Sequence, residues 1–154
     1  MSEREATELD EREALLTQNQ FPLGSIPKGW KVVKLNKTLS KVIDNRGKTP
    51  PFAENGAHEL IEIASLRNVE KNPNYSAVTK YVSADVFESW FRDHIKDDDI
   101  LVSTVGSVGL SALIEEKRGA IAQNLIALRT NELCDARFLF NWTRSSDCHR
   151  QIRR

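Results

Sequence analysis

The sequence predicts an α/β fold of the α+β type: one twisted, mostly antiparallel sheet with flanking helices, preceded by a separate N-terminal helix. Three observations support this class. The chain has 154 residues, 40% hydrophobic and 29% charged, which is typical of one globular domain. Several apolar runs have the length of short strands and are bounded by Gly, Pro, Asn or Asp. Two other segments repeat apolar residues at helical spacing.

An acidic helix is predicted first, over residues 3–18, with Ser2 as its N-cap. Its apolar positions are too sparse to anchor a core, so we expect it to contact a partner chain. Two prolines and two glycines within 21–29 end the helix. The predicted organisation is therefore an arm over 1–20 and a domain over 21–154.

Six runs of the domain are predicted as short strands: 30–35, 40–44, 59–65, 99–105, 110–116 and 120–129. The run 110–116 should return antiparallel to 99–105 through a tight turn at Gly106 and Gly109, which are placed there for backbone geometry. A second turn is predicted over 45–51, where Gly47 permits unusual backbone angles and two prolines exclude a helix.

Two helices are predicted in the domain. Residues 83–94 should form one with Ser83 as N-cap, and residues 135–146 should form the other. In both, large apolar side chains fall on one face, namely Val86, Phe87, Trp90 and Phe91 in the first and Phe138, Leu139 and Trp142 in the second.

The charge is unevenly distributed although the net charge of the chain is zero. Residues 1–20 hold six acidic and two basic residues, whereas 21–154 hold 16 acidic and 20 basic residues, a net charge of +4. Basic residues concentrate in 28–48 and in 137–154. Such a pair of basic segments is suited to a surface that faces phosphates.

Three motifs follow one another along the domain. An Ile-Pro-x-Gly-Trp start at 26–30 leads through an apolar run to Gly-x-Thr-Pro at 47–50. DDDILVSTVGSVG follows at 97–109, and AQNLIALR at 122–129 precedes FLFNW at 138–142. The ordered set resembles the target-recognition domain of type I restriction–modification specificity subunits, over roughly residues 22–146.

The chain departs from that family pattern at two points. Asp98-Asp99 stands where the family usually carries Gly-Asp, and we expect Asp98 to adopt the turn angles in place of Gly. A full specificity subunit carries two recognition domains joined by long helices, whereas this sequence carries one. The resemblance therefore suggests a half-subunit or an excised domain.

The resemblance implies a non-catalytic, cytoplasmic protein that reads double-stranded DNA and needs no cofactor and no membrane. It would direct a separate DNA adenine methyltransferase (modification) subunit and a separate restriction subunit to a split site. A half-subunit would work most simply as a homodimer.

Three segments carry side chains suited to base edges and phosphates: the basic turn over 45–50, the irregular segment 66–80, and the glycine turn. The candidate DNA-binding residues are Asn45, Arg46, Lys48, Thr49, Arg67, Asn68, Lys71, Asn72, Asn74, Tyr75, Lys80 and Ser107. Gln123 and Asn124 are expected instead to be buried amides that bond to the backbone.

Two alternatives remain. Asp99, followed by Glu115 and Lys117 in the next strand, matches the pattern by which many restriction-type nucleases hold a metal ion, a pattern that also arises by chance in a highly charged chain. The segments 3–18 and 135–146 could instead make the chain a protein-interaction or dimerisation module that reads no DNA.

Other residue types carry weaker signals. The three histidines, His58, His94 and His149, have no metal-ligand spacing, so no metal site is predicted. The two cysteines, Cys134 and Cys148, lie far apart and suggest reduced thiols. Trp30, Trp90 and Trp142 are expected in the core or in subunit contacts, and no apolar run is long enough for a membrane span.

Overall fold

The structure is a computed structural model, and it describes residues 27–45, 47 and 49–152. The chain divides into two units, residues 1–35 and residues 36–154. The predicted helix at 3–18 and two candidate residues, Arg46 and Lys48, lie outside the described residues. The predicted boundary between arm and domain at residue 20 stays a prediction.

The described part of the first unit, residues 27–35, holds a turn in which the amide of Trp30 donates to the carbonyl of Pro27 at 3.0 Å. The strand predicted over 30–35 is wrong: its residues are exposed and pair with no described strand. A run of strand-favouring residues forms a strand only when another strand pairs with it. The 3-10 helix η1 (Leu35–Lys37) follows.

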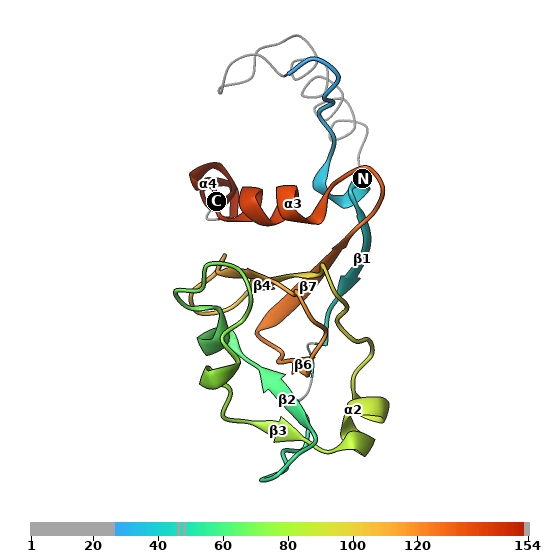
Figure 1. Cartoon of the computed structure of the whole chain (residues 1–154), viewed down its shortest axis with the longest axis vertical. Coiled ribbons are helices and arrows are strands. Elements are labelled where there is room, and N and C mark those ends of the chain that lie inside the picture. Colours follow the sequence, from blue (N-terminus) through green and yellow to red (C-terminus); the bar gives the residue numbers. More distant parts are fainter. Residues whose placement is uncertain (1–26, 46, 48, 153–154) are drawn as a thin grey trace. The chain divides into compact units, whose positions relative to one another are not determined.

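A four-stranded antiparallel sheet is the centre of the second unit (Figure 1). Its order is β1 (Leu39–Ile43), β7 (Leu125–Thr130), β4 (Ile100–Ser103) and β5 (Ser111–Leu113). The register places Val42 opposite Leu128 and Leu128 opposite Ile100, so these side chains share one face.

A second, three-stranded sheet has the order β3 (Tyr81–Val82), β2 (His58–Ile61) and β6 (Ala120–Ile121). Its β2–β6 pairing is parallel, and all other pairings in the two sheets are antiparallel. The predicted strand over 120–129 is therefore two strands that belong to different sheets. The predicted fold class is confirmed, with two sheets in place of one.

Three short helices follow the strands β2 and β3 of the second sheet. Two 3-10 helices, η2 (Ile63–Leu66) and η3 (Tyr75–Ala77), come after β2. The helix α2 (Ala84–Trp90) begins at its predicted N-cap, where the hydroxyl of Ser83 accepts the amide of Val86 at 3.3 Å. It packs through Phe87, whose ring stacks on His58 with centroids 3.9 Å apart and lies 4.3 Å from the His94 ring.

The helix predicted over 135–146 is α3 (Ala136–Thr143), and a second helix that the sequence did not predict, α4 (Ser146–Ile152), follows it. The carboxylate of Asp135 caps α3 by accepting the amide of Phe138 at 3.0 Å. The hydroxyl of Ser145 ends one helix and starts the next, because it donates to the carbonyl of Trp142 at 2.7 Å and accepts the amide of Cys148 at 3.2 Å.

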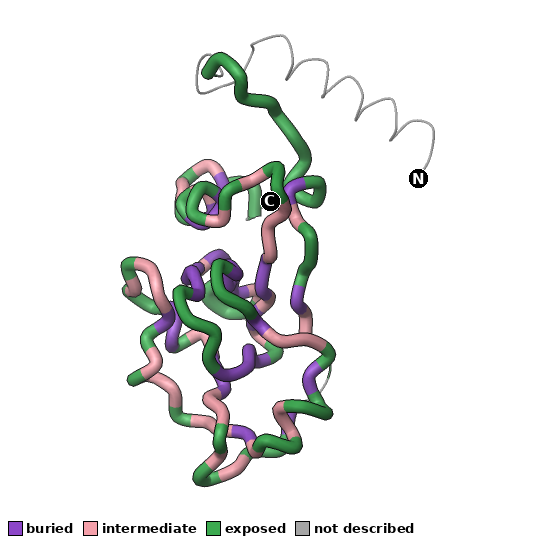
Figure 2. The backbone as a smooth tube through the Cα atoms, turned by 45° about the vertical axis from the view of Figure 1, so that its right-hand side comes forward, coloured by how far each residue is buried: buried purple, intermediate pink, exposed green. Residues whose placement is uncertain are grey.

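Apolar clusters pack on both faces of the four-stranded sheet, and buried residues gather in the middle of the second unit (Figure 2). All residues of β4 and β5 are buried, whereas three of the five residues of β1 are exposed. Leu139 and Phe140 of α3 pack on one face against Ile100, Leu113 and Leu128. On the other face, residues of η2 and β6 join those of the sheet in a larger cluster. A third cluster lies between the small sheet and α2.

Other predictions about single residues have mixed outcomes. Trp142 packs against the core, whereas Trp30 and Trp90 are exposed in this chain. Cys134 and Cys148 are free thiols, and burial raises the pKa of both. No helix in the described ranges has the length and apolar character to cross a membrane.

Candidate nucleic-acid interface

Three loops lie at one end of the four-stranded sheet because of the strand directions. Ile43, the last residue of β1, pairs with Ala127, and Ser103, the last residue of β4, pairs with Leu125, the first residue of β7. The described residues of 44–50, together with the segments 104–109 and 122–124, therefore lie at the same end of the sheet, and we call them the loop end. It unites the predicted 45–50 turn with the predicted glycine turn.

Side chains and backbone groups link these three loops. The amide of Gln123 donates to the hydroxyl of Thr49 at 3.5 Å. The amide and the hydroxyl of Thr104 both donate to the carbonyl of Asn124, at 3.0 and 3.3 Å. The loop end is thus one connected surface.

Asn45 positions a cation that sequence reasoning missed. Its side chain donates to the carbonyl of Asp93 at 3.2 Å and accepts the amide of Arg92 at 3.1 Å. Gly47 has a φ of +135°, and a Cβ atom there would lie 3.5 Å from the guanidinium of Arg92. The exposed guanidinium of Arg92 therefore lies beside the 45–50 loop, and no sequence pattern indicated this because the two segments are far apart in the chain.

The glycine turn is held in one shape by a buried hydroxyl. The Oγ of Ser103 donates to the carbonyl of Ser107 at 2.6 Å and accepts the amide of Leu110 at 2.9 Å. Gly106 and Gly109 have φ values of +73° and +89°, which confirms their predicted backbone role. The side chain of Ser107 is exposed on this rigid turn, as a DNA contact would require.

Most candidates of the 66–80 segment are bound to their own chain. Lys71 forms an ion pair with Glu115, and the side chain of Asn72 accepts the amide of Glu115 at 3.3 Å. Asn74 caps η3 by accepting the amide of Ser76 at 3.1 Å. These three polar side chains hold the segment in place. Arg67 and Asn68 remain exposed.

Two further candidates of that segment also have structural partners. The ring of Tyr75 packs against the core, and its pKa is raised because burial disfavours the charged form. Lys80 forms a 2.9 Å ion pair with Glu62, and its ammonium lies 5.2 Å from the centroid of the Phe52 ring.

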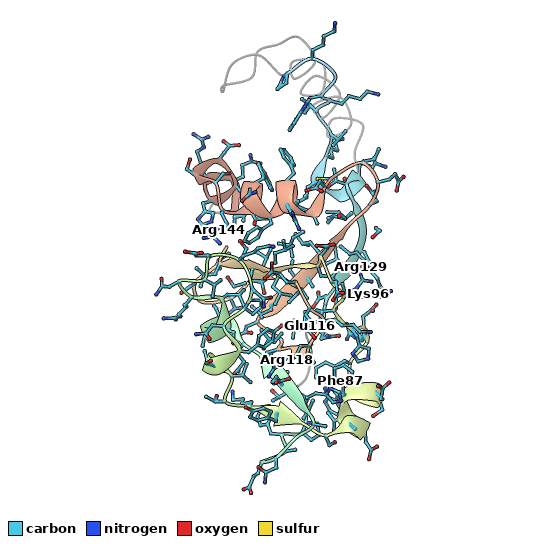
Figure 3. The ribbon with its side chains drawn as sticks, in the orientation of Figure 1. Phe87, Lys96, Glu116, Arg118, Arg129 and Arg144 are labelled. Atoms are coloured by element: carbon cyan, nitrogen blue, oxygen red, sulfur yellow. The ribbon has the colours of Figure 1, made fainter. Side chains whose placement is uncertain are left out.

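Three arginines outside the predicted site stabilise the second unit (Figure 3). Arg118 bonds to Glu59, which lowers the pKa of that carboxyl, and its guanidinium lies 4.8 Å from the centroid of the Tyr75 ring. Arg144 donates to two backbone carbonyls of the 66–80 segment. Arg129 binds a buried carboxylate that immediately precedes the neighbouring strand β4. The positive charge predicted to face phosphates is thus partly used within the fold.

The buried carboxylate is that of Asp99, the first residue of the alternative nuclease pattern. It is 0% exposed, and both of its oxygens accept from the guanidinium of Arg129 at 2.8 Å. One oxygen also accepts the amide of Lys96 at 2.7 Å. Glu115 meanwhile pairs with Lys71. These contacts leave Asp99 unsuited to a metal ligand, and no cluster of three ligand-type side chains occurs within the described ranges.

The prediction for the two amides of the loop end needs correction. Gln123 is exposed and bonds to a side chain rather than to the backbone, because the chain turns there between β6 and β7. The Oδ1 of Asn124 is buried without a hydrogen-bond partner among the described residues.

The fold is similar to that of solved subunits of type I restriction–modification systems. The HsdS subunit from Thermoanaerobacter tengcongensis superposes with a TM-score of 0.58 and 21% identity, over 90% of this chain and 33% of that one. A second structure, described as the structural basis underlying complex assembly and conformational transition of the type I R-M system, superposes with a TM-score of 0.59 and the same identity and coverage.

The chain thus spans about a third of the length of these solved chains. No protein-family model matches the sequence. No curated protein matches it either.

Proposed function

We propose that the chain recognises double-stranded DNA as a target-recognition domain of a type I restriction–modification specificity subunit. The observation that carries the proposal is the likeness in fold to HsdS over 90% of the chain. The resemblance found in the sequence motifs points the same way and is independent of the superposition. In this proposal the chain itself is not catalytic.

The loop end supports the proposal by its chemistry. It presents the hydroxyls of Thr49 and Ser107 and the amide of Gln123, and the guanidinium of Arg92 lies beside it at Gly47. Hydroxyls, amides and arginines are the groups that contact phosphates and base edges in DNA complexes. The 45–50 segment adds two cations in its sequence, Arg46 and Lys48.

The proposed partners follow from the same assignment. A DNA adenine methyltransferase subunit and a restriction subunit would act at the site that this chain selects. A second copy of the chain would supply the second recognition domain of a split site, with the segment 1–20 as a contact between subunits. Sedimentation of the full chain, with and without residues 1–20, would measure this association.

A salt titration of DNA binding tests the proposal. The full chain should bind a short duplex of mixed sequence weakly, with a dissociation constant of roughly 10⁻⁴–10⁻⁶ M at physiological salt. Each lost phosphate contact should flatten the slope of log affinity against log salt by about 0.9. Arg92→Ala and the double variant Arg46→Ala/Lys48→Ala should therefore both flatten the slope measured by fluorescence anisotropy.

The matched control is Lys96→Ala. This exposed lysine precedes β4, whose first residue lies at the opposite end of the sheet from the loop end, so its loss removes one positive charge without touching the loop end. The control should keep the parental slope. If all three variants keep the parental slope of log affinity against log salt, the loop end does not face DNA. The same conclusion follows if DNA binding by the parent does not depend on salt.

A further inference from the structure

We infer that Arg67 and Asn68 form a base-reading tip that discriminates a guanine and an adjacent adenine in the major groove. The inference rests on the proposed DNA recognition and assigns specificity within it. Both residues are exposed, at the point where the chain leaves η2. Among the described residues, neither side chain has a hydrogen-bond or ion-pair partner.

The backbone of Arg67 and Asn68 has a defined conformation. The amide of Arg67 donates to the carbonyl of Ala64 at 3.3 Å and closes η2. Asn68 has a φ of +54°, a left-handed conformation that Asn adopts more readily than most residues. This conformation reverses the chain at a tip of two residues.

The chain that follows the tip is clamped from one side by Arg144 (Figure 3). Its Nη1 donates to the carbonyl of Val69 at 3.0 Å and to that of Glu70 at 2.6 Å. The same guanidinium lies 5.2 Å from the centroid of the Phe140 ring on α3. The tip is therefore tied to the helix that covers the sheet.

The next residues of the segment are bound to the edge strand β5 and to η2. The carbonyl of Lys71 accepts the amide of Leu113 at 2.9 Å, and the ammonium of Lys71 pairs with Glu115. The amide of Asn74 donates to the carbonyl of Ser65 at 2.8 Å. The polar side chains that follow the clamp serve the fold, whereas Arg67 and Asn68 remain available to a ligand.

The two side chains match the major-groove code for purines. Arg donates two hydrogen bonds to O6 and N7 of guanine, and Asn exchanges a pair with N6 and N7 of adenine. A clamped backbone lowers the conformational entropy lost on binding, which favours affinity and selectivity. The start of η2 lies beside the loop end, because a Cβ on Gly106 would be 3.8 Å from the side chain of Ile63.

The experiment selects DNA from a random-sequence duplex pool with the full chain at low salt and sequences the bound fraction. The parent should enrich a site that contains a guanine and an adenine. The enriched duplex is then remade with 7-deazaguanine or 7-deazaadenine, which lack the N7 acceptor, at these positions. We expect the parent to lose about 10- to 100-fold in affinity at each of the two bases.

The variants assign each loss to one side chain. Arg67→Ala should become insensitive to 7-deazaguanine at one position, and Asn68→Ala to 7-deazaadenine, while both bind unselected DNA within about a factor of ten of the parent. Arg144→Lys, which retains the charge but not the two-carbonyl clamp, should weaken both preferences without abolishing either. The matched control, Lys96→Ala, should leave both intact, and circular dichroism spectra of all variants verify the fold.

Two results would overturn the inference in distinguishable ways. If the parent enriches no sequence, the proposed DNA recognition is wrong, and the inference about Arg67 and Asn68 is wrong with it. If the parent enriches a site but Arg67→Ala and Asn68→Ala keep its full sensitivity to the deaza bases, DNA recognition stands and the base-reading residues lie elsewhere.

Discussion

Asp99, which immediately precedes β4, binds Arg129 of the neighbouring strand β7 through a carboxylate that is 0% exposed. Every oxygen of the carboxylate has a donor, so the pair is satisfied within the protein. Asp99→Ala removes the carboxylate partner of the Arg129 guanidinium, which keeps its 3.1 Å hydrogen bond to the carbonyl of His94. We expect the variant to lower the free energy of unfolding by about 3–5 kcal/mol. Urea denaturation followed by circular dichroism measures the loss.

The control for this substitution is Asp147→Ala. It breaks an ion pair with Arg150 on the surface of α4, and such pairs contribute about 0–1 kcal/mol. Equal losses in the two variants would show that burial of Asp99 adds nothing to its contribution.

Residues governed by their own backbone were predictable from the sequence. Asp98 has a φ of +63°, as expected for an Asp in place of a turn Gly, and Ser83 caps its helix. The same local rules failed for the candidate site. Lys71 and Tyr75 looked like DNA contacts because their partners, Glu115 and Arg118, lie more than 40 residues away in sequence.

At the scale of elements, the packing of α3 on the sheet is the main contact to test. Leu139 is buried between α3 and the strands β4, β5 and β7. Leu139→Ala removes apolar contacts and leaves a cavity, so the free energy of unfolding should fall by about 2–5 kcal/mol. Thermal or urea unfolding measures the change.

Leu133→Ala provides the comparison for that variant. Leu133 is 62% exposed on the loop before α3, so the same truncation creates no cavity there. Its stability should stay within about 0.5 kcal/mol of the parent. A loss as large as that of Leu139→Ala would mean that Leu133 packs on a part of the protein or a partner that its exposure does not reveal.

The elements themselves were predictable to different degrees. Strands with a strong local pattern, such as β4 and β5, lie within the predicted runs, since a hairpin needs only neighbouring residues. The predicted strand at 30–35 failed and the run 120–129 divided between two sheets. Both outcomes depend on which strand, far away in the sequence, supplies the backbone hydrogen bonds. The local composition of a run does not determine that strand.

At the scale of the whole molecule, two carboxylates make the free energy of unfolding depend on pH in the acidic range. Glu59, bonded to Arg118, and Asp93, bonded to Lys41, have pKa values below their ordinary 4.5 and 3.8. Because the folded-state pKa is the lower one, their contribution is present above the ordinary values and is lost as pH falls through the folded-state values. We expect the free energy of unfolding to decline below about pH 4.5.

Urea unfolding over an acidic pH series measures this decline. The double variant Glu59→Gln/Asp93→Asn removes both titrating groups, so its stability should change less over the same range. A double variant with the parental pH dependence would assign the decline to other groups.

The pairing of β1 also sets an order of events when the chain is made. Leu39 lies opposite Thr130, and among the described residues β7 is the strand that pairs with β1 in the sheet. A nascent chain therefore presents β1 long before its partner leaves the ribosome, whereas the β4–β5 hairpin can form as soon as it emerges. Contacts between residues so distant in sequence slow folding. β1, the first of the described strands in the sequence, is thus among the last to pair, and until then its unpaired backbone groups can bind other nascent chains.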